Sequence, residues 1–493
     1  MKDFDAYLEE IGEIGYVQSI VSSIFYVSGL PNARLNELVI AENGMIGIVR
    51  SVLADLVEVM IFEGQNLGHN MKVVRTNEYF QVPVSDEFLG RVIDPFGITQ
   101  DSGEPIAQEK LFFREVDPPA PSLFQRAKIS KNMETGVMIV DLLVPLGIGQ
   151  RELILGDPKT GKTMFCLQAM VNQVRAGAIG IYVSCGKKKS DLKFTESFFK
   201  GAKVMEKLVI IAASSSDPAP MVYLAPFSAM SVAEHFRDKG NNVLVVVDDL
   251  TMHAKFYREI SLLTKRPPGR QSYPGDIFHV HAKIAERAGN IRLADGKEAA
   301  ITLLPIAETL EGDLTGYIQT NLMAMTDGHI FFDVAEAKRG KLPAISYTLS
   351  VSRVGNQTRT PLEREIATKL IFWLNETGKA EELGKFGVEL SEETMKALQV
   401  SRQLEGLFVQ DPGMIYPKGL QILFVGLFLT NFWQGVSSSE LTRQKKVLYD
   451  AYIAGSLDKV KLKINKANAL SELMTILNSE AAALKKLLEV KKK

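Results

Sequence analysis

One eight-residue stretch, GDPKTGKT from Gly156 to Thr163, constrains the fold of this chain more than any other feature. It follows the apolar run LIL at 153–155 and precedes a stretch without a helix breaker until Gly177. The pattern G-x-x-x-x-G-K-[ST] predicts a buried strand, a tight loop and then a helix. Glycines let the backbone curl and direct its N–H groups at an anion, which the helix N-terminus also favours. The stretch therefore predicts an α/β domain with a phosphate-binding loop.

The loop and a strand downstream together predict a site for Mg²⁺ and ATP or ADP. Lys162 is expected to reach the β and γ phosphates, and the Thr163 hydroxyl to ligate Mg²⁺. The apolar run 243–247 ends in Asp248. A carboxylate at the C-terminal end of a buried parallel strand lies beside the phosphate loop and can hold the magnesium shell. The candidate nucleotide-binding residues are Gly156, Asp157, Pro158, Lys159, Thr160, Gly161, Lys162 and Thr163.

Hydrophobic patterning divides the chain into three parts. Residues 1–76 read as strands of a small barrel or sandwich, and Asn43-Gly44 is their strongest hairpin signal. Residues 77–356 contain short apolar runs separated by stretches long enough for crossover helices, which predicts a parallel sheet. Residues 357–493 look mostly helical. The four expected sheet strands are RELILG, AIGIYVSC, KLVIIAA and NVLVVVDDL.

Composition narrows the classes of function. A formal net charge of −1 over 493 residues argues against a chain that holds nucleic acid by bulk electrostatics. Cys166 and Cys185 show no spacing typical of a disulfide framework or a zinc site. The most apolar stretch, residues 419–433, is shorter than the roughly 20 residues of a membrane span, so a buried helix is expected there. The acidic N-terminus lacks the apolar core of a signal peptide.

Four motifs, in this order along the chain, resemble the α subunit of F-type ATP synthases. The resemblance implies an N-terminal β-barrel, a central RecA-like P-loop α/β domain and a C-terminal helical bundle, in agreement with the three parts above. It also implies an alternating ring with β-type catalytic subunits around a γ-type central shaft, peripheral to the cytoplasmic face of the cell membrane. A δ-type stator and a membrane ring are further candidate partners. The motifs are GQRELILGDPKTGKT, RPPGRQSYPGDIF, TNLMAMTDGHIFF and LSVSRVGNQTR.

The resemblance also implies roles for single residues. Lys162, Thr163 and Asp248 look like the Mg-nucleotide site of a mainly non-catalytic, regulatory pocket. Arg353 looks like an arginine finger for the neighbouring β site, a task that suits the planar, always charged guanidinium. From the residues alone, Arg353 would more often be a surface salt-bridge former. In catalytic relatives a Gly-Glu-Arg carboxylate positions the attacking water, but here Lys187 stands in that place and cannot do so when protonated. The isolated chain is therefore expected to be nearly inactive.

Several positions depart from the family. Pro158 and Lys159 stand where the loop usually has arginine and glutamine, Leu342 where it has a nucleotide-contacting arginine, and Ala324 where it has serine. These changes leave the occupancy of the pocket and its nucleotide preference open. About fourteen residues precede GYVQSI, where the family carries a helical extension that docks a δ-type stator. A stator-less rotary motor is therefore an alternative to a synthase coupled to proton transport.

Other interpretations have less support. A homohexameric RNA translocase of the termination-factor type needs a basic, aromatic barrel face, whereas this barrel segment is rich in Glu and Asp, so no nucleic-acid partner is expected. A self-sufficient export-type ATPase needs its own carboxylate where Lys187 stands. His279 and His281 would share a face on a strand and could ligate metal. A structural role is favoured, because no carboxylate or thiol lies at fitting spacing.

Overall fold

The computed structural model describes residues 3–62, 68–385 and 392–490. The chain separates into two compact units, which are described one at a time. The first unit comprises Met1–Lys128, Gly149–Ile154 and Val174–Thr326. The second comprises Ile129–Ile148, Leu155–Gln173 and Asp327–Lys493.

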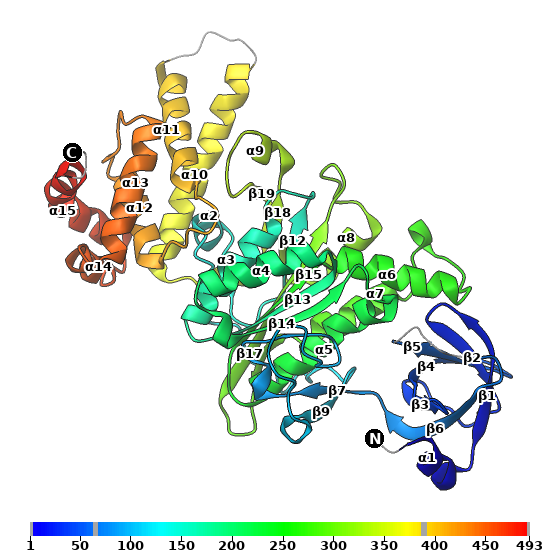
Figure 1. Ribbon diagram of the computed structural model, residues 1–493. Helices are drawn as coiled ribbons and strands as arrows, with labels where there is room; N and C mark the ends of the chain where they lie inside the picture. Colours follow the sequence, from blue (N-terminus) through cyan, green and yellow to red (C-terminus); the bar gives the residue numbers. More distant parts are fainter. Residues whose placement is uncertain (1–2, 63–67, 386–391, 491–493) are drawn as a thin grey trace. The chain divides into compact units, whose positions relative to one another are not determined.

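The first unit begins with a closed β-barrel of strand order β1-β2-β5-β4-β3-β6 (Figure 1). Neighbouring strands pair antiparallel around the whole barrel. The predicted hairpin at Asn43-Gly44 is confirmed between β3 and β4, where Gly44 adopts a φ of 82° and the Asn43 side chain accepts from the Met45 amide. The barrel strands are β1 (Ile14–Val21), β2 (Ile24–Ser28), β3 (Glu37–Ala41), β4 (Ile46–Val52), β5 (Val57–Ile61) and β6 (Lys72–Tyr79).

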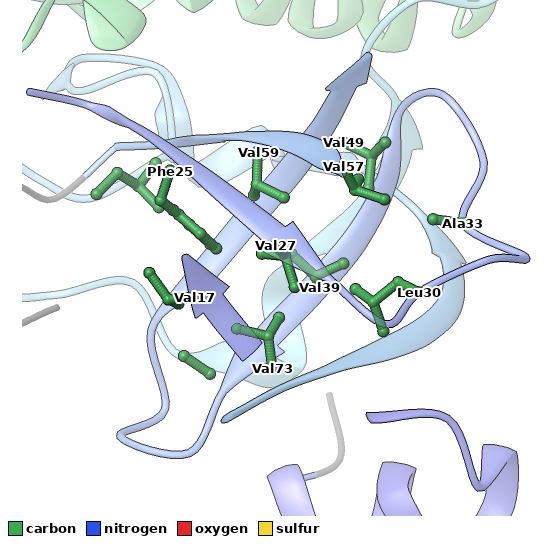
Figure 2. Close-up of a cluster of buried hydrophobic side chains, with 12 residues drawn as sticks. Val17, Phe25, Val27, Leu30, Ala33, Val39, Val49, Val57, Val59 and Val73 are labelled. Atoms are coloured by element: carbon green, nitrogen blue, oxygen red, sulfur yellow. The ribbon is translucent and has the colours of Figure 1, made fainter. Parts of the chain in front are cut away.

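Valines from most of the barrel strands fill the barrel interior, as Figure 2 shows. Val17, Val39, Val59 and Val73 have no exposed surface. Branched side chains pack well on a pleated surface, and each one buried contributes roughly 1.5–3 kcal/mol. The alternating apolar pattern of these strands therefore supplies the barrel with a core of its own.

A short helix, α1 (Phe4–Ile11), precedes the barrel and corrects the expectation that residues 1–76 form strands alone. Phe4, Leu8 and Ile11 recur at helical spacing, and they pack with Tyr7 against Ile40 and Val74. Asp3 caps the helix by accepting from the amide of Ala6. The helical period was present in the sequence but was too short to stand out beside the strand signals that follow.

A largely parallel sheet forms the rest of the first unit, with the order β12-β17-β15-β13-β14-β8. The pairs β13/β14, β13/β15, β15/β17 and β14/β8 are parallel, and only β16 joins β17 antiparallel among the pairs described here. All four predicted strands are present, so the parallel α/β sheet is confirmed. The strands are β8 (Val92–Ile93), β12 (Glu152–Gly156), β13 (Ile179–Lys187), β14 (Leu208–Ser214), β15 (Val243–Asp248), β16 (Gly289–Arg292) and β17 (Glu298–Glu308).

Helices and a second small sheet complete the first unit. Residues between consecutive parallel strands form helices, as right-handed crossover connections require. The small antiparallel sheet pairs β7 (Gln81–Val84) with β9 (Phe112–Glu115). The helices are α4 (Lys189–Gly201), α5 (Ala219–Asp238), α6 (Leu250–Leu263), α7 (Ile277–Glu286) and α8 (Tyr317–Met325).

The second unit holds the phosphate loop, two small strand pairs and the C-terminal helices. β10 (Asn132–Met133) pairs with β11 (Leu146–Gly147), and β18 (Gly328–Phe332) pairs antiparallel with β19 (Ile345–Ser352). The predicted helical character after residue 357 is confirmed. The helices are α2 (Met138–Leu143), α3 (Lys162–Arg175), α9 (Val334–Lys338), α10 (Pro361–Lys385), α11 (Glu392–Phe408), α12 (Lys418–Leu429), α13 (Ser438–Ile453), α14 (Asp458–Ile464) and α15 (Leu470–Val490).

The most apolar stretch of the chain forms α12, in which every residue from Leu420 to Phe428 is buried. A helix that is apolar on all faces must be covered on all faces, which explains its place inside the helical bundle. α15 instead buries a single stripe that includes Leu473, Leu477 and Leu484. Within residues 3–62, 68–385 and 392–490, no helix is both long enough and apolar enough to cross a membrane.

Candidate nucleotide-binding site

The phosphate loop connects β12 to α3 and has the backbone shape that the motif predicts. Gly156 has a φ of 153° and Gly161 a φ of 104°, conformations that residues with side chains rarely adopt. A Cβ atom on Gly156 would lie 2.5 Å from the carbonyl oxygen of Phe332. Both glycines are therefore required by local geometry.

The Lys162 side chain lies inside the curl of this loop. Only 6% of the residue is exposed, and its ammonium donates to the carbonyl oxygens of Gly156 at 2.8 Å and Asp157 at 2.6 Å. The Thr160 hydroxyl also donates to the Asp157 carbonyl, at 2.8 Å. These hydrogen bonds hold the Lys162 ammonium beside the N-terminus of α3. The ammonium and the helix dipole both attract an anion to this place.

The remaining loop residues take different positions. Thr163 is half-buried in the first turn of α3, while Pro158 and Lys159 are exposed at the tip of the loop. Lys159 has a positive φ of 64°. These two loop residues, which depart from the usual pattern, therefore alter the outer surface of the loop and leave the buried Lys162 in place.

In the first unit, β15 ends at Asp248, whose side chain is fully buried. The Lys187 ammonium lies 2.5 Å from Asp248 Oδ1 and 3.7 Å from Asp249 Oδ2. The Tyr182 hydroxyl donates to Asp248 Oδ2 at 2.8 Å. Both oxygens of the Asp248 carboxylate therefore face a donor from β13.

The parallel register of the sheet brings these groups together. Ser184 of β13 lies opposite Asp248 of β15, so the C-terminal ends of both strands reach the same edge. Gly186 has a φ of 67°, and a Cβ atom there would lie 2.5 Å from the Phe256 ring. This close contact fixes the course of the chain immediately before Lys187.

Charges within the cluster shift the pKa values of its members. Burial lowers the pKa of Lys187, but the negative charges of Asp248 and Asp249 outweigh burial and raise that pKa above its ordinary value. Burial, together with the charge of Asp248, raises the pKa of Asp249 to about 7, against the effect of Lys187. Lys187 is therefore a charged ammonium at neutral pH, and the cluster balances most of its own charge.

The residues around Asp248 do not fit a magnesium ion. Mg²⁺ requires oxygen ligands in octahedral geometry, whereas an ammonium and a hydroxyl donor already meet the Asp248 carboxylate. In the part of the chain that the structure describes, no group of three His, Cys, Asp or Glu residues could hold a metal ion.

Arg353 occupies the turn that follows β19, and its side chain is exposed. The turn is held by Gly355, where a Cβ atom would lie 1.6 Å from the Pro145 carbonyl oxygen. The Ser352 hydroxyl donates to the same oxygen at 2.6 Å. Among the described residues, no carboxylate forms an ion pair with the Arg353 guanidinium. The turn is held against Pro145, and it leaves the Arg353 side chain exposed.

Sequence reasoning missed two residues of these sites. Tyr182 lies within an apolar strand run, and no motif spacing connects it to Asp248. Gly355 follows Arg353 in SRVGNQ, and only the approach of Pro145 shows why it must be glycine. A glycine two residues after a predicted functional arginine was the one available signal.

The histidine pair corrects one premise of the sequence analysis. His279 and His281 lie on helix α7, not on a strand, and only His281 is buried. Its Nε2 lies 3.2 Å from Nδ1 of the buried His253, whose Nε2 contacts the Tyr223 carbonyl at 3.0 Å. The structural role favoured for this pair fits His281, because its buried ring on α7 contacts the ring of His253 on α6.

Comparison with known proteins gives the family. A sequence model described as ATP synthase alpha/beta family, nucleotide-binding domain, matches residues 136–352. A protein of Dictyoglomus turgidum, ATP synthase subunit alpha, is 38% identical over 439 residues, which cover 88% of this chain and 85% of the relative. The chain belongs to the ATP synthase alpha/beta family.

Other members of this family with similar sequences are also named as alpha subunits. ATP synthase subunit alpha 1 of Paraburkholderia xenovorans is 43% identical over 358 residues, or 72% of this chain and 70% of the relative. ATP synthase subunit alpha of Neorickettsia sennetsu is 34% identical over 463 residues, or 92% and 90%. The similarity to alpha subunits thus extends beyond the nucleotide-binding domain to most of the chain.

Proposed function

We propose that this chain is the α-type, mainly non-catalytic and regulatory subunit of an F-type rotary ATPase. The observation that carries the proposal is the Lys187 ammonium bound to Asp248 at the end of the sheet strands. A hydrolytic site needs a group that orients water, and a charged lysine cannot accept the proton. The phosphate loop nevertheless keeps its glycines and its buried lysine, so the chain holds a nucleotide that it does not hydrolyse.

In this proposal the loop Gly156–Thr163 binds the phosphates of ATP or ADP. The Lys162 ammonium exchanges its two carbonyl acceptors for phosphate oxygens, and the first turn of α3 supplies backbone donors. Thr163 remains the candidate magnesium ligand on the loop. Asp248 was the second candidate, and its contact with Lys187 argues against that role.

Arg353 is proposed to act in an adjacent β-type subunit, where it would stabilise the charge of the transition state. Its support is the exposed guanidinium on a turn that Gly355 and Ser352 hold against Pro145. A planar fork of donors matches phosphate oxygens, and arginine fingers contribute on the order of 10³–10⁵ in kcat. Because these contacts already hold the backbone of the turn, engagement has to order the arginine side chain alone.

The assembly proposed is an alternating ring with β-type subunits around a γ-type shaft, peripheral to the cytoplasmic face of the cell membrane. A δ-type stator and a membrane ring would couple it to proton transport. The similarity to named alpha subunits over most of the chain supports these partners. We also propose functional domains at residues 1–76, 77–356 and 357–493.

The test is reconstitution of the chain with its β-type partner, followed by native mass measurement and ATPase assays. We expect an alternating ring, a nearly inactive isolated chain, and a loss of about a thousandfold in kcat on Arg353→Ala. Arg364→Ala, a change of an exposed arginine on α10, is the matched control and should leave kcat unchanged. Robust hydrolysis by the isolated chain, or full activity of the Arg353→Ala ring, would refute the proposal.

A further inference from the structure

We propose that a cavity in the first unit binds an aromatic organic cation, meaning a flat ring system that carries a positive charge. The cavity has a volume of about 720 Å³, within the range of roughly 300–1,000 Å³ that is usual for small-molecule sites. It lies between the β-barrel and the small sheet of β7 and β9, which belong to the same unit. None of the residues proposed to bind the nucleotide lines it, so this inference does not depend on the proposed function.

One face of the small sheet forms a wall of the cavity. Pro83 of β7 pairs with Phe113 of β9, and Gln81 pairs with Glu115. Residues that lie opposite one another on paired strands share a face of the sheet, and alternation along each strand places both pairs on the same face. All four residues line the cavity. The strand register therefore directs an aromatic ring and a carboxylate into one space.

Three phenylalanine rings in mutual contact form a second wall. The ring centroids of Phe62 and Phe80 lie 5.6 Å apart, and the Phe96 ring lies 4.8 Å from Phe62 and 5.9 Å from Phe80. The buried Asp94 carboxylate holds the segment of Phe96, since it accepts from the amides of Phe96 and Ile98 at 2.8 and 2.9 Å. Aromatic faces stack on flat rings and attract cations through their quadrupole.

Apolar side chains at the mouth of the cavity are left uncovered. Tyr79, Ile98 and Phe113 line the cavity and are between 49% and 61% exposed. Apolar surface that gathers around a hollow is typical of a binding site, because an occupant removes that surface from water.

The charges of the cavity favour a cation. Glu78 and Glu115 line it, and its lining residues include no lysine, arginine or histidine. Among the residues that the structure describes, neither carboxylate forms an ion pair. The Tyr7 hydroxyl donates to Glu78 at 2.8 Å, whereas Arg114 lies on the other face of β9 and donates to Asp238 at 2.6 Å. Two carboxylates beside aromatic rings attract an organic cation and repel an anion.

The experiment is a fluorescence titration of the full-length chain at neutral pH with thioflavin T, a flat aromatic cation. A parallel titration uses anilinonaphthalene sulfonate, an aromatic anion. We expect the cation to bind at least about tenfold more tightly than the anion. The double variant Glu78→Gln with Glu115→Gln should weaken thioflavin T binding by about tenfold. The matched control, Glu104→Gln with Glu109→Gln, removes the same charge from exposed residues outside the cavity and should keep the wild-type Kd.

A second pair of variants tests the aromatic wall. Phe113→Ala removes a ring from the cavity and should weaken thioflavin T binding by about fivefold. The matched control is Phe112→Ala, because Phe112 is equally exposed on the same strand but stacks on His235 and does not line the cavity. It should leave the Kd of thioflavin T unchanged.

Each outcome supports or overturns the proposal. Anion binding as tight as cation binding would overturn it, and so would a wild-type Kd in the Glu78→Gln, Glu115→Gln variant or equal losses in Phe112→Ala and Phe113→Ala. The absence of saturable thioflavin T binding to the wild type would overturn it without any variant, so a variant that does not fold leaves the test intact. Light scattering reports another occupant: a wild-type dimer that Phe113→Ala dissociates would assign this face to a second copy of the chain and overturn the proposal.

Discussion

Replacing Lys187 by methionine removes the positive charge from the Asp248 cluster while keeping most of the side-chain volume. The variant leaves Asp248 fully buried, keeps the hydrogen bond from the Tyr182 hydroxyl and leaves Asp249 nearby. We expect a clear loss in the free energy of unfolding, because a buried carboxylate loses its counter-ion and cannot regain water.

The size of the loss follows from the burial of the pair. Removing one partner of a buried ion pair costs about 3–5 kcal/mol. Lys187 is 22% exposed and the Tyr182 hydrogen bond remains, so the value should lie near the lower limit, at about 3 kcal/mol. The pKa of Asp249, already raised to about 7, should rise further when the ammonium is lost. The folded variant therefore holds a proton on Asp249 up to a higher pH than the wild type does, and giving up that proton destabilises the fold. The loss in the free energy of unfolding caused by Lys187→Met should accordingly be larger at pH 8 than at pH 6.

The assay is equilibrium unfolding in urea at both pH values, followed by circular dichroism. Lys189→Met serves as the control, since an exposed side chain of the same type should change the free energy by no more than about 0.5 kcal/mol. A loss below about 1 kcal/mol for Lys187→Met, or an equal loss in both variants, would show that the ammonium is not the counter-ion of Asp248.

Three further changes test other parts of the structure. Burial lowers the pKa of His253 to about 4, so between pH 7 and pH 5 this side chain binds fewer protons in the folded chain than in the unfolded chain. The free energy of unfolding of the wild type should therefore fall by about 2 kcal/mol more than that of His253→Gln over this pH range. Urea titrations measure the difference, and the control His279→Gln should behave as the wild type. Gly355→Ala should disorder the Arg353 turn and lower the kcat of the reconstituted ring, because its Cβ would overlap the Pro145 carbonyl oxygen; unchanged kcat would contradict this. Lys445→Met should cost about 1–3 kcal/mol in thermal unfolding, since the ammonium donates to the carbonyls of residues 406, 407 and 409, and an unchanged midpoint would count against that role.

The local sequence pattern is sufficient to predict those segments whose conformation does not depend on the rest of the chain. The loop glycines at 156 and 161 have the positive φ values that their motif requires, and the apolar runs form the buried strands. The largely apolar run at 419–433 supplies most of the buried helix α12, because a helix without a distinct polar face must be covered. Short elements are harder to predict: the strand pattern of the first 76 residues hides helix α1, and the spacing of His279 and His281 does not by itself show that they lie on a helix.

The sequence by itself therefore determined the fold class, the phosphate loop and the absence of a carboxylate at position 187. Only the tertiary structure decided what Lys187 does, because Asp248 lies 61 positions further along the chain and no spacing rule joins the two residues. The parallel pairing of β13 with β15 brings both strand ends to one edge, and burial there makes the attraction strong. A charge acts according to its neighbours and its access to water, and those are properties of the folded chain.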